Sequence, residues 1–251
     1  MAPRLYVPVA LSAGVVLALP PAVARPVPVL RLQPGGAVTL FNGEGGEWSA
    51  TVDRMGRSEV DVRVDAFDAV ERELPFRVVL AFGVPANERM DGLVEKATEL
   101  GVAAIEPLVC ERSVLRLNGE RAVKKRLHWQ AVAATASEQC GRTRVPRVEG
   151  VMVLDDWLAA FGKAPTDARI RHYVLSLRGP VVAAERPPSV AASAGYVFLS
   201  GPEGGLTDAE ERAAIDCGFV PLDLGTRILR ADTAPIAVLA ALGLWGVVSG
   251  A

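Results

Sequence analysis

The alternation of hydrophobic and polar residues predicts a strand-rich region over residues 1–72. Val60, Val62 and Val64 alternate with Asp61 and Arg63, which is the period-two pattern of a half-buried strand. Segments rich in β-branched residues predict strands over Ala37–Phe41, Trp48–Val52 and Glu59–Val64. Asn-Gly and Gly-Gly pairs supply tight turns between them. This region is therefore predicted to form a small antiparallel β-barrel.

Beyond residue 72 the pattern changes to strands that alternate with helices. Met90, Leu93, Ala97 and Leu100 fall at helical spacing within residues 87–100, and Gly101 ends that helix. Further helices are expected over Arg121–Gln139 and Thr233–Val248, and buried strands over Arg77–Phe82, Ala103–Pro107, Val174–Leu177, Tyr196–Leu199 and Phe219–Leu222. This alternation predicts an α/β domain over residues 73–251, with a parallel sheet covered by helices on both faces.

Composition agrees with a globular protein, since half of the 251 residues are hydrophobic and 22% are charged. The net charge of −2 conceals an uneven distribution, because residues 112–147 contain nine Lys or Arg and two Glu. A basic band of this kind suits a polyanionic partner. A solvated helix face is the alternative interpretation.

The N-terminus imitates a secretion signal. An apolar stretch from Leu5 to Leu19 precedes Ala22-Val23-Ala24, which looks like a cleavage site. Pro8 interrupts the stretch, however, and cleavage would remove a predicted first strand. We therefore expect a cytoplasmic protein and keep secretion as an alternative.

Membrane insertion and metal binding are not expected. No run reaches the roughly 18 apolar residues that a membrane span needs. The three cysteines form no CxxC pair, and the two histidines lack the spacing of a metal site.

A glycine-rich turn over residues 199–207, Leu-Ser-Gly-Pro-Glu-Gly-Gly-Leu-Thr, joins an apolar strand to a helix. Thr207 and Glu210 have the spacing of a capping box, which fixes the helix start. The glycines would let backbone groups approach a ligand closely. A plain connection fits the spacing equally well. The glycines of residues 43–46 precede a strand, so they are interpreted as a hairpin.

Two further segments carry arginines in unusual places. Arg227 and Arg230, with Asp232, precede an otherwise apolar helix. An ion pair of Arg230 with Asp232 or Glu203 would be the simpler explanation. Downstream of the predicted long helix, residues 142–144 are doubly basic, which suits phosphate contacts or a solvated loop.

Five segments together resemble the RsmE family, the ribosomal small-subunit RNA uracil-N3 methyltransferases of the SPOUT superfamily. They lie in the family's order along nearly the whole chain, over Val94–Val102, Glu111–Ser113, Ser137–Arg142, Gly201–Gly205 and Gly225–Arg230. The last two are specific in combination.

The resemblance implies a PUA-like RNA-binding domain at the N-terminus and a SPOUT methyltransferase domain with a trefoil knot at the C-terminus. It also implies a homodimer that acts on 16S ribosomal RNA and binds S-adenosylmethionine in the knot. The implied cofactor contacts are Leu177, Leu199, Ser200, Gly201, Pro202, Glu203, Gly204, Gly205, Leu224, Gly225, Ile228, Leu229, Arg230, Thr233 and Ala234. The implied RNA contacts are Arg4, Arg31, Arg112, Arg142 and Arg144.

The reaction would need a cation and a carboxylate, because uracil N3 becomes nucleophilic only when its proton leaves. Arg230 is the candidate that stabilises the developing anion. Glu203 or Asp232 would accept the proton or orient Arg230.

The chain departs from the family pattern at four positions. Pro26, Gly36, Gly92 and Asp232 stand where a histidine, an aspartate, a bulky residue and a glutamate are usual. The alternatives kept are a SPOUT methyltransferase acting on ribose 2′-O or on transfer RNA, and an RNA-binding protein without catalysis.

Overall fold

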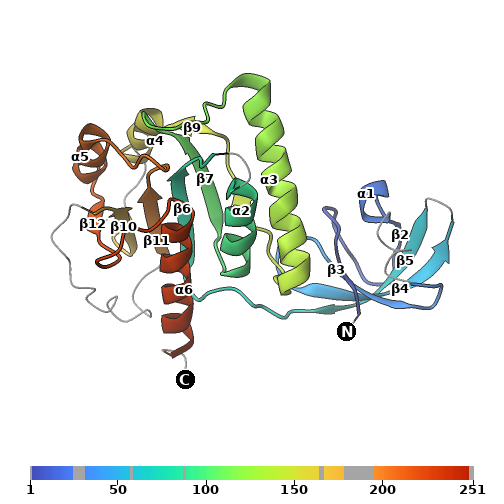
Figure 1. Cartoon of the computed structure of the whole chain (residues 1–251). Helices are drawn as coiled ribbons and strands as arrows, with labels where there is room; N and C mark the ends of the chain where they lie inside the picture. Colours follow the sequence, from blue (N-terminus) through green and yellow to red (C-terminus); the bar gives the residue numbers. More distant parts are fainter. Residues whose placement is uncertain are drawn as a thin grey trace. The chain divides into compact units, whose positions relative to one another are not determined.

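The computed structural model describes residues 2–24, 32–56, 59–86, 89–163, 167–177 and 195–248 (Figure 1). The chain divides into two compact units, which are described separately. The first comprises Met1–Glu73 with Ala134–Val145, and the second comprises Leu74–Ala133 with Pro146–Ala251. Pro26 and Arg31 lie outside the described residues.

The first unit is built on a five-stranded sheet with the order β1-β3-β4-β5-β2. Its elements are β1 (Arg4–Tyr6), β2 (Val16–Ala18), α1 (Pro21–Ala24), β3 (Ala37–Phe41), β4 (Glu47–Met55) and β5 (Val60–Asp68). The predicted antiparallel pairing is confirmed for β3, β4, β5 and β2, whereas β1 pairs parallel to β3. Val60, Val62 and Val64 are buried, so the predicted alternation of β5 is confirmed as well.

The apolar N-terminal stretch belongs to this unit. Leu5, Val7 and Leu19 are at most 5% exposed and pack into one core with Val38, Leu40 and their neighbours. Removal of residues 1–24 would therefore take two strands and part of the core away from the sheet.

The glycines of residues 43–46 form the predicted hairpin between β3 and β4. Gly43, Gly45 and Gly46 have φ angles of 85°, 109° and 67°, the left-handed region that favours glycine. A strand follows directly, so this loop does not open a helix as a nucleotide-binding loop would.

The second unit has a parallel sheet with the order β12-β10-β11-β6-β7-β8, and β9 also pairs with β7. Its strands are β6 (Arg77–Gly83), β7 (Ala104–Val109), β8 (Arg147–Val148), β9 (Met152–Val153), β10 (Ile170–Leu175), β11 (Gly195–Ser200) and β12 (Val220–Leu222). Its helices are α2 (Arg89–Glu99), α3 (Gly119–Cys140, whose last turns belong to the first unit), α4 (Leu154–Phe161), α5 (Asp208–Asp216) and α6 (Thr233–Val248). The predicted parallel sheet is confirmed.

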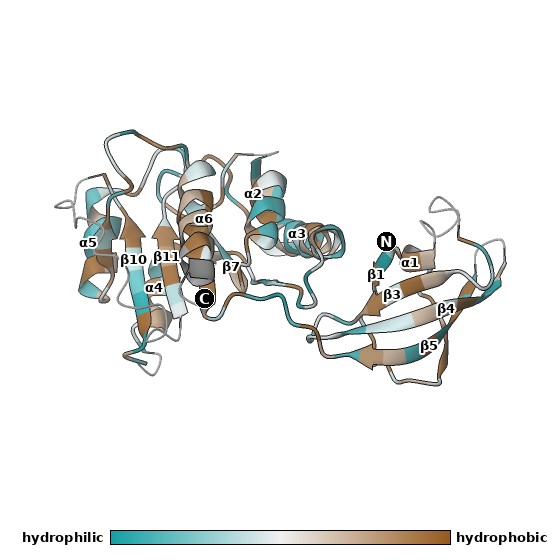
Figure 2. Cartoon of the chain, turned by 90° about the horizontal axis from the view of Figure 1, so that it is seen from below, coloured by the Kyte–Doolittle hydropathy of each residue, from teal (hydrophilic) through white to brown (hydrophobic). Residues whose placement is uncertain are grey.

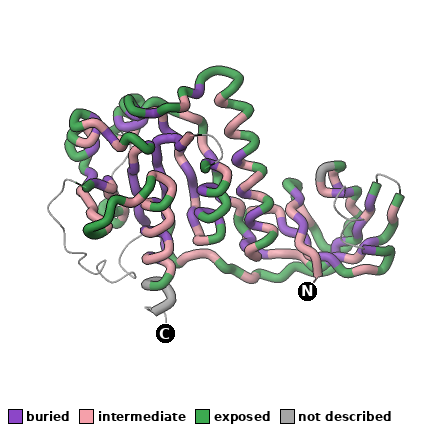
Figure 3. The backbone as a smooth tube through the Cα atoms, viewed as in Figure 1, coloured by how far each residue is buried: buried purple, intermediate pink, exposed green. Residues whose placement is uncertain are grey.

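Helices cover both faces of this sheet (Figure 1). On one face, Val79, Val197 and Leu199 pack against α4 and α5. Trp157 of α4 and Phe219, in the segment after α5, contribute large rings there. On the other face lie α2 and α6. Strands β6 and β11 are buried almost throughout, as Figure 3 shows, so they form the centre of the domain.

Helix α6 consists almost wholly of apolar residues, and its coloured part in Figure 2 is pale to brown. Val238, Leu239 and Leu242 are buried, while Leu244 is 71% exposed. Among the described residues, no helix combines the length and the hydropathy needed to cross a membrane.

Candidate active site

A cavity of ≈ 520 Å³ opens at the carboxyl edge of the second unit's sheet. Most of its lining comes from the ends of β10, β11 and β12 and the residues after them, and Arg89 of α2, Arg112 after β7 and Glu211 of α5 complete it. Parallel sheets commonly bind ligands at this edge, where the strand ends leave a crevice. The volume lies within the range of ~300–1,000 Å³ typical of small-molecule sites.

The turn after β11 forms one wall through its backbone. The N–H of Gly205 donates to the carbonyl of Pro202 at 2.8 Å, and Gly205 has a φ of 69°. A Cβ atom at Gly201 would lie 2.5 Å from the backbone nitrogen of Leu206, so only glycine fits there. The predicted capping box is confirmed, because the Thr207 side chain accepts from the N–H of Glu210 and the Glu210 side chain accepts from the N–H of Thr207.

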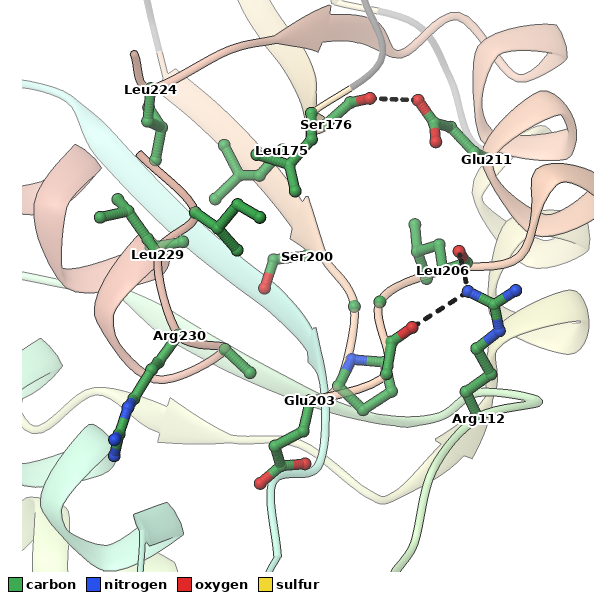
Figure 4. Close-up of a pocket in the computed structure, with 18 of the residues that line it drawn as sticks. Arg112, Leu175, Ser176, Ser200, Glu203, Leu206, Glu211, Leu224, Leu229 and Arg230 are labelled. Carbon is green, nitrogen blue, oxygen red and sulfur yellow. Dashed lines mark hydrogen bonds between the residues drawn. The ribbon is translucent and has the colours of Figure 1, made fainter. Parts of the chain in front are cut away.

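Arg112 stabilises this turn through hydrogen bonds from its side chain. Its Nη1 donates to the carbonyls of Gly204 and Leu206 at 3.0 and 3.3 Å (Figure 4). Arg112 thus lies at the cavity wall, with part of its guanidinium engaged by backbone oxygens.

The loop between β12 and α6 forms the opposite wall. Leu224, Ile228, Leu229 and Arg230 line the cavity from this side. The apolar residues of this wall, together with Leu175 and Leu222, make an apolar slot of the kind that accepts a flat heterocycle. The two turns that the sequence singled out are therefore brought together around one cavity.

Polar groups stand at defined points of the slot. The Ser200 hydroxyl is buried and has no hydrogen-bond partner among the described residues. Ser176 Oγ donates to the carboxylate of Glu211 (Figure 4). An unsatisfied buried hydroxyl costs free energy until a ligand bonds it, and a carboxylate suits the hydroxyls of a ribose. These residues fit a nucleoside ligand.

The charged mouth of the cavity contains Glu203, Arg230 and Arg89. Glu203 Oε1 accepts from the N–H of Ala86 at 2.9 Å and lies 4.0 Å from Nη1 of Arg89. Arg230 makes no side-chain hydrogen bond or ion pair within the described part of the chain, so the simpler ion-pair explanation is not borne out. In Figure 4, Arg230 and Glu203 extend in the same direction, away from Ser176 and Glu211.

Most of the predicted cofactor residues line this cavity, namely Leu177, Ser200, Gly201, Pro202, Glu203, Gly204, Gly205, Leu224, Ile228, Leu229, Arg230 and Ala234. Leu199, Gly225, Thr233 and the predicted catalytic Asp232 do not. Leu199 is wholly buried in the sheet, and the N–H of Gly225 donates to Asp223 Oδ1. Thr233 is exposed, and the buried Oδ1 of Asp232 has no partner among the described residues.

The motifs missed Arg89, Ser176 and Glu211 as lining residues. Ser176 directly follows β10, so the rule that ligands bind beyond the carboxyl ends of parallel strands could have found it. Nothing in the spacing marks Arg89 or Glu211.

Several arginines predicted to contact RNA are engaged inside the first unit. Arg4 pairs with Glu47, donates to the carbonyl of Arg142 at 3.0 Å and lies over the ring of Phe41. Arg142 is 4% exposed, and its Nε donates to Glu73 at 2.9 Å. As placed, both guanidinium groups support the fold.

Arg144 is more accessible than these two. Its side chain is 52% exposed, and its Nε donates to Glu71 at 2.9 Å. The pKa of Glu71 lies below its ordinary value although burial alone would raise it, because Arg144 and Thr143 bond the carboxylate. The fifth predicted residue, Arg31, lies outside the described residues.

Comparisons with known proteins identify the family. The family model for an RNA methyltransferase domain matches residues 72–243, and the model for an RNA methyltransferase PUA domain matches residues 27–65. The ribosomal RNA small subunit methyltransferase E of Bacillus subtilis is 32% identical over 86% of this chain and 84% of its own length. The chain belongs to the ribosomal RNA small subunit methyltransferase E family.

Solved structures support this membership of the methyltransferase E family. The enzyme of that name from Neisseria gonorrhoeae, bound to S-adenosyl methionine, has a TM-score of 0.86 and 34% identity, over 97% of this chain and 98% of its own. A methyltransferase from Legionella pneumophila in complex with the same cofactor has a TM-score of 0.86 and 33% identity, over 97% and 98%. The predicted family, its PUA-like and SPOUT-type domains and the methyltransferase class are thereby confirmed.

Proposed function

We propose that this methyltransferase E family member transfers a methyl group from S-adenosylmethionine to N3 of a uridine in 16S ribosomal RNA. The observation that carries the proposal is the convergence of the turns after β11 and β12 on one cavity. Relatives with this fold have been solved with the cofactor bound, and the family name specifies small-subunit ribosomal RNA.

The cofactor would lie between the two turns. Its adenine would occupy the slot of Leu175, Leu222 and Leu229, and a ribose hydroxyl would meet Ser200 or Glu211. When bound, it supplies a methyl group on a cationic sulfur. Because Gly201 and Gly204 have no side chains, the backbone N–H and C=O groups of the turn could approach the cofactor closely. Bonds from the backbone would cost no side-chain entropy.

The chain's own residues would make uracil reactive. Arg230 has an uncommitted guanidinium at the mouth and would stabilise negative charge on the ring as N3 loses its proton. Glu203 lines the cavity and would take the proton, which favours it over Asp232, since Asp232 lies outside the lining. The target base must leave its stack to enter such a crevice.

A second copy of the chain would cover the apolar surface near the site. Leu177 and Ile228 of the cavity lining are 61% and 82% exposed, and Leu244 on the apolar helix α6 is 71% exposed, so these exposed apolar residues favour a homodimer. We also propose the trefoil knot, with the cavity in it, and action in the cytoplasm, where small ribosomal subunits are found. Of the described arginines of the PUA-containing unit that were predicted to contact RNA, Arg144 has the most exposed side chain, so it is the one we propose for phosphate contact.

The test uses small subunits purified from cells that lack the modification. After incubation with enzyme and cofactor, nucleosides are analysed by mass spectrometry, and N3-methyluridine is expected. A 2′-O-methylated nucleoside, or methylation of transfer RNA alone, would replace this proposal by one of the other SPOUT activities.

Arg230→Ala examines the site itself. Loss of one preorganised donor to a developing anion costs about a hundredfold or more in rate. We expect such a loss with unchanged affinity for S-adenosylhomocysteine by calorimetry. Full turnover in this variant would remove Arg230 from the mechanism.

A further inference from the structure

A cation that no motif singled out stands beside the proposed catalytic pair. Arg89, the first residue of α2, lines the same cavity as Glu203 and Arg230. Its Nη1 lies 4.0 Å from Glu203 Oε1, and its side chain is 42% exposed. That contact is too long for a hydrogen bond, so the guanidinium keeps donors for a ligand.

The surroundings of Arg89 are held against the turn after β11. Glu203 is bonded by the N–H of Ala86, which follows the end of β6. Gly83, the last residue of β6, lies so close to Pro202 that a Cβ atom there would be 2.5 Å from the proline Cδ. The chain leading to α2 and the turn that carries Glu203 thus form one wall.

The chemistry of uracil calls for two cations rather than one. When N3 loses its proton, the charge spreads over the two carbonyl oxygens that flank it. A single guanidinium placed beside one carbonyl leaves the other unsatisfied, and donors aimed at developing charge act best when they are preorganised. Arg230 approaches from the loop before α6, and Arg89 approaches from α2.

The other arginines of the lining are less suited to this role. Arg112 already donates to two carbonyls of the turn. Arg227 belongs to the same loop as Arg230 and adds no second direction of approach.

We propose that Arg89 is a second catalytic cation, which contacts one uracil carbonyl while Arg230 contacts the other. The proposal rests on the proposed uracil-N3 activity. The N3 proton passes to the carboxylate of Glu203, the N3 electron pair forms the bond to the methyl carbon, and the carbon–sulfur bond breaks with its electrons left on sulfur. Glu203, whose side chain is 28% exposed, then returns the proton to solvent.

The experiment compares wild-type protein with Arg89→Gln, Arg89→Lys and the control Lys96→Gln. Lys96 also lies on α2, pairs with Glu95 and Glu99, and does not line the cavity. Single-turnover methylation of unmodified small subunits is measured from pH 6.5 to 9.5. Calorimetry with S-adenosylhomocysteine and binding of the subunits in its presence are measured in parallel.

We expect Arg89→Gln to lower the rate constant about a hundredfold at neutral pH, which is the loss seen when one such donor is removed. The difference in rate constant between Arg89→Gln and wild type should narrow as the pH rises, because the target uridine then loses its N3 proton without stabilisation by the cation. Arg89→Lys should recover part of the rate, Lys96→Gln should match wild type, and cofactor affinity should be unchanged.

Wild-type rates in Arg89→Gln would overturn the role of Arg89 and leave the proposed function standing. So would a deficit that stays constant with pH and follows weakened cofactor binding, because that pattern belongs to a structural residue. A wild-type product other than N3-methyluridine would overturn the proposed function, and this inference with it.

Discussion

Gly201 has no room for a side chain. A Cβ atom would lie 2.5 Å from the nitrogen of Leu206 and 2.6 Å from the carbonyl carbon of Gly205, both of them backbone atoms. Backbone cannot rotate away as a flexible side chain can, so the turn itself would have to open. The cavity wall depends on this one position.

Gly201→Ala should therefore weaken the binding of S-adenosylhomocysteine by at least about tenfold, which corresponds to about 1.4 kcal/mol. Isothermal titration calorimetry measures this directly. Gly150→Ala is the matched control, because a Cβ atom at Gly150 meets nothing within 4 Å. Equal affinities in the two variants would show that the turn tolerates a side chain.

The residue-level predictions succeeded for turns and helix starts, which depend on local backbone chemistry. They fell short for side chains whose environment is set by residues distant in the sequence. Glycine and proline spacing located the turn after β11, and Thr207 with Glu210 located the helix start. The involvement of Arg142 with Glu73 could not be foreseen, because 69 residues separate the two along the chain. Its basic side chain beside a glycine suggested phosphate instead.

At the scale of the element, helix α2 has one buried face and one exposed face, and the two differ in how they affect its stability. Met90, Leu93 and Ala97 are buried as predicted, whereas Leu100 follows the end of the helix and is half-buried. A Cβ atom at Gly92 would meet nothing within 4 Å. A glycine in the interior of a helix loses more backbone entropy on folding than alanine does. Gly92 therefore lowers the stability of α2, and an alanine at this position would remove that entropy cost.

Gly92→Ala should raise the free energy of unfolding by ~0.5–1 kcal/mol, because alanine reduces this entropy cost and meets nothing within 4 Å. Urea unfolding followed by circular dichroism measures the change. Methylation should stay at the wild-type rate. A lower stability would indicate that the exposed face of α2 makes contacts that require glycine.

Elements with a clear apolar pattern were predictable, and elements with weak or interrupted local signals were not. The bounds predicted for α6 and β3 agree with the structure. Helix α4 was missed, because it has eight residues and Val153 at its N-cap offers no side-chain hydrogen bond. Strand β10 begins at Ile170, earlier than predicted. The prediction started it too late because Arg171 and His172 interrupt the apolar pattern.

At the scale of the molecule, half-buried carboxylates stabilise the first unit. Glu47 in β4 bonds both Arg4 of β1 and Arg72. Burial alone would raise the pKa of Glu47, but its bonds to Arg72 and Arg4 outweigh burial and hold the pKa below its ordinary value of 4.5. The ionised carboxylate thus stabilises the folded state.

The sign of this effect predicts its pH dependence. A carboxylate with a lowered folded-state pKa contributes its full stability above pH 4.5 and loses it as the pH falls through the folded-state value. Wild-type protein should therefore exceed Glu47→Gln in stability near pH 7, and the difference should shrink below pH 4.5. Hydrogen exchange of peptides from residues 37–55, in urea at several pH values, measures it.

Glu59→Gln serves as the control for this prediction, because Glu59 is 76% exposed and lies 3.8 Å from Arg54. It should differ little from wild type at any pH. A difference between wild type and Glu47→Gln that does not change with pH would show that charge is not what Glu47 contributes.

The grouping of residues 134–145 with the first unit illustrates what local pattern leaves open. The helical periodicity of α3 is continuous through this segment, so nothing in it marks a change of unit. The change follows from partners such as Tyr6, whose N–H donates to Glu138, and these lie more than a hundred residues away.

The close packing of Gly83 on Pro202 bears on how the binding of the two proposed ligands, the nucleoside cofactor and the RNA, could be coupled. A Cβ atom at Gly83 would lie 2.5 Å from Pro202 Cδ, so the end of β6 and the turn after β11 pack with no space even for a methyl group between them. If a nucleoside bound at the turn raises the affinity of this region for RNA, thermodynamic reciprocity requires the RNA to raise the affinity for the nucleoside by the same factor. The release of one product would then weaken the binding of the other.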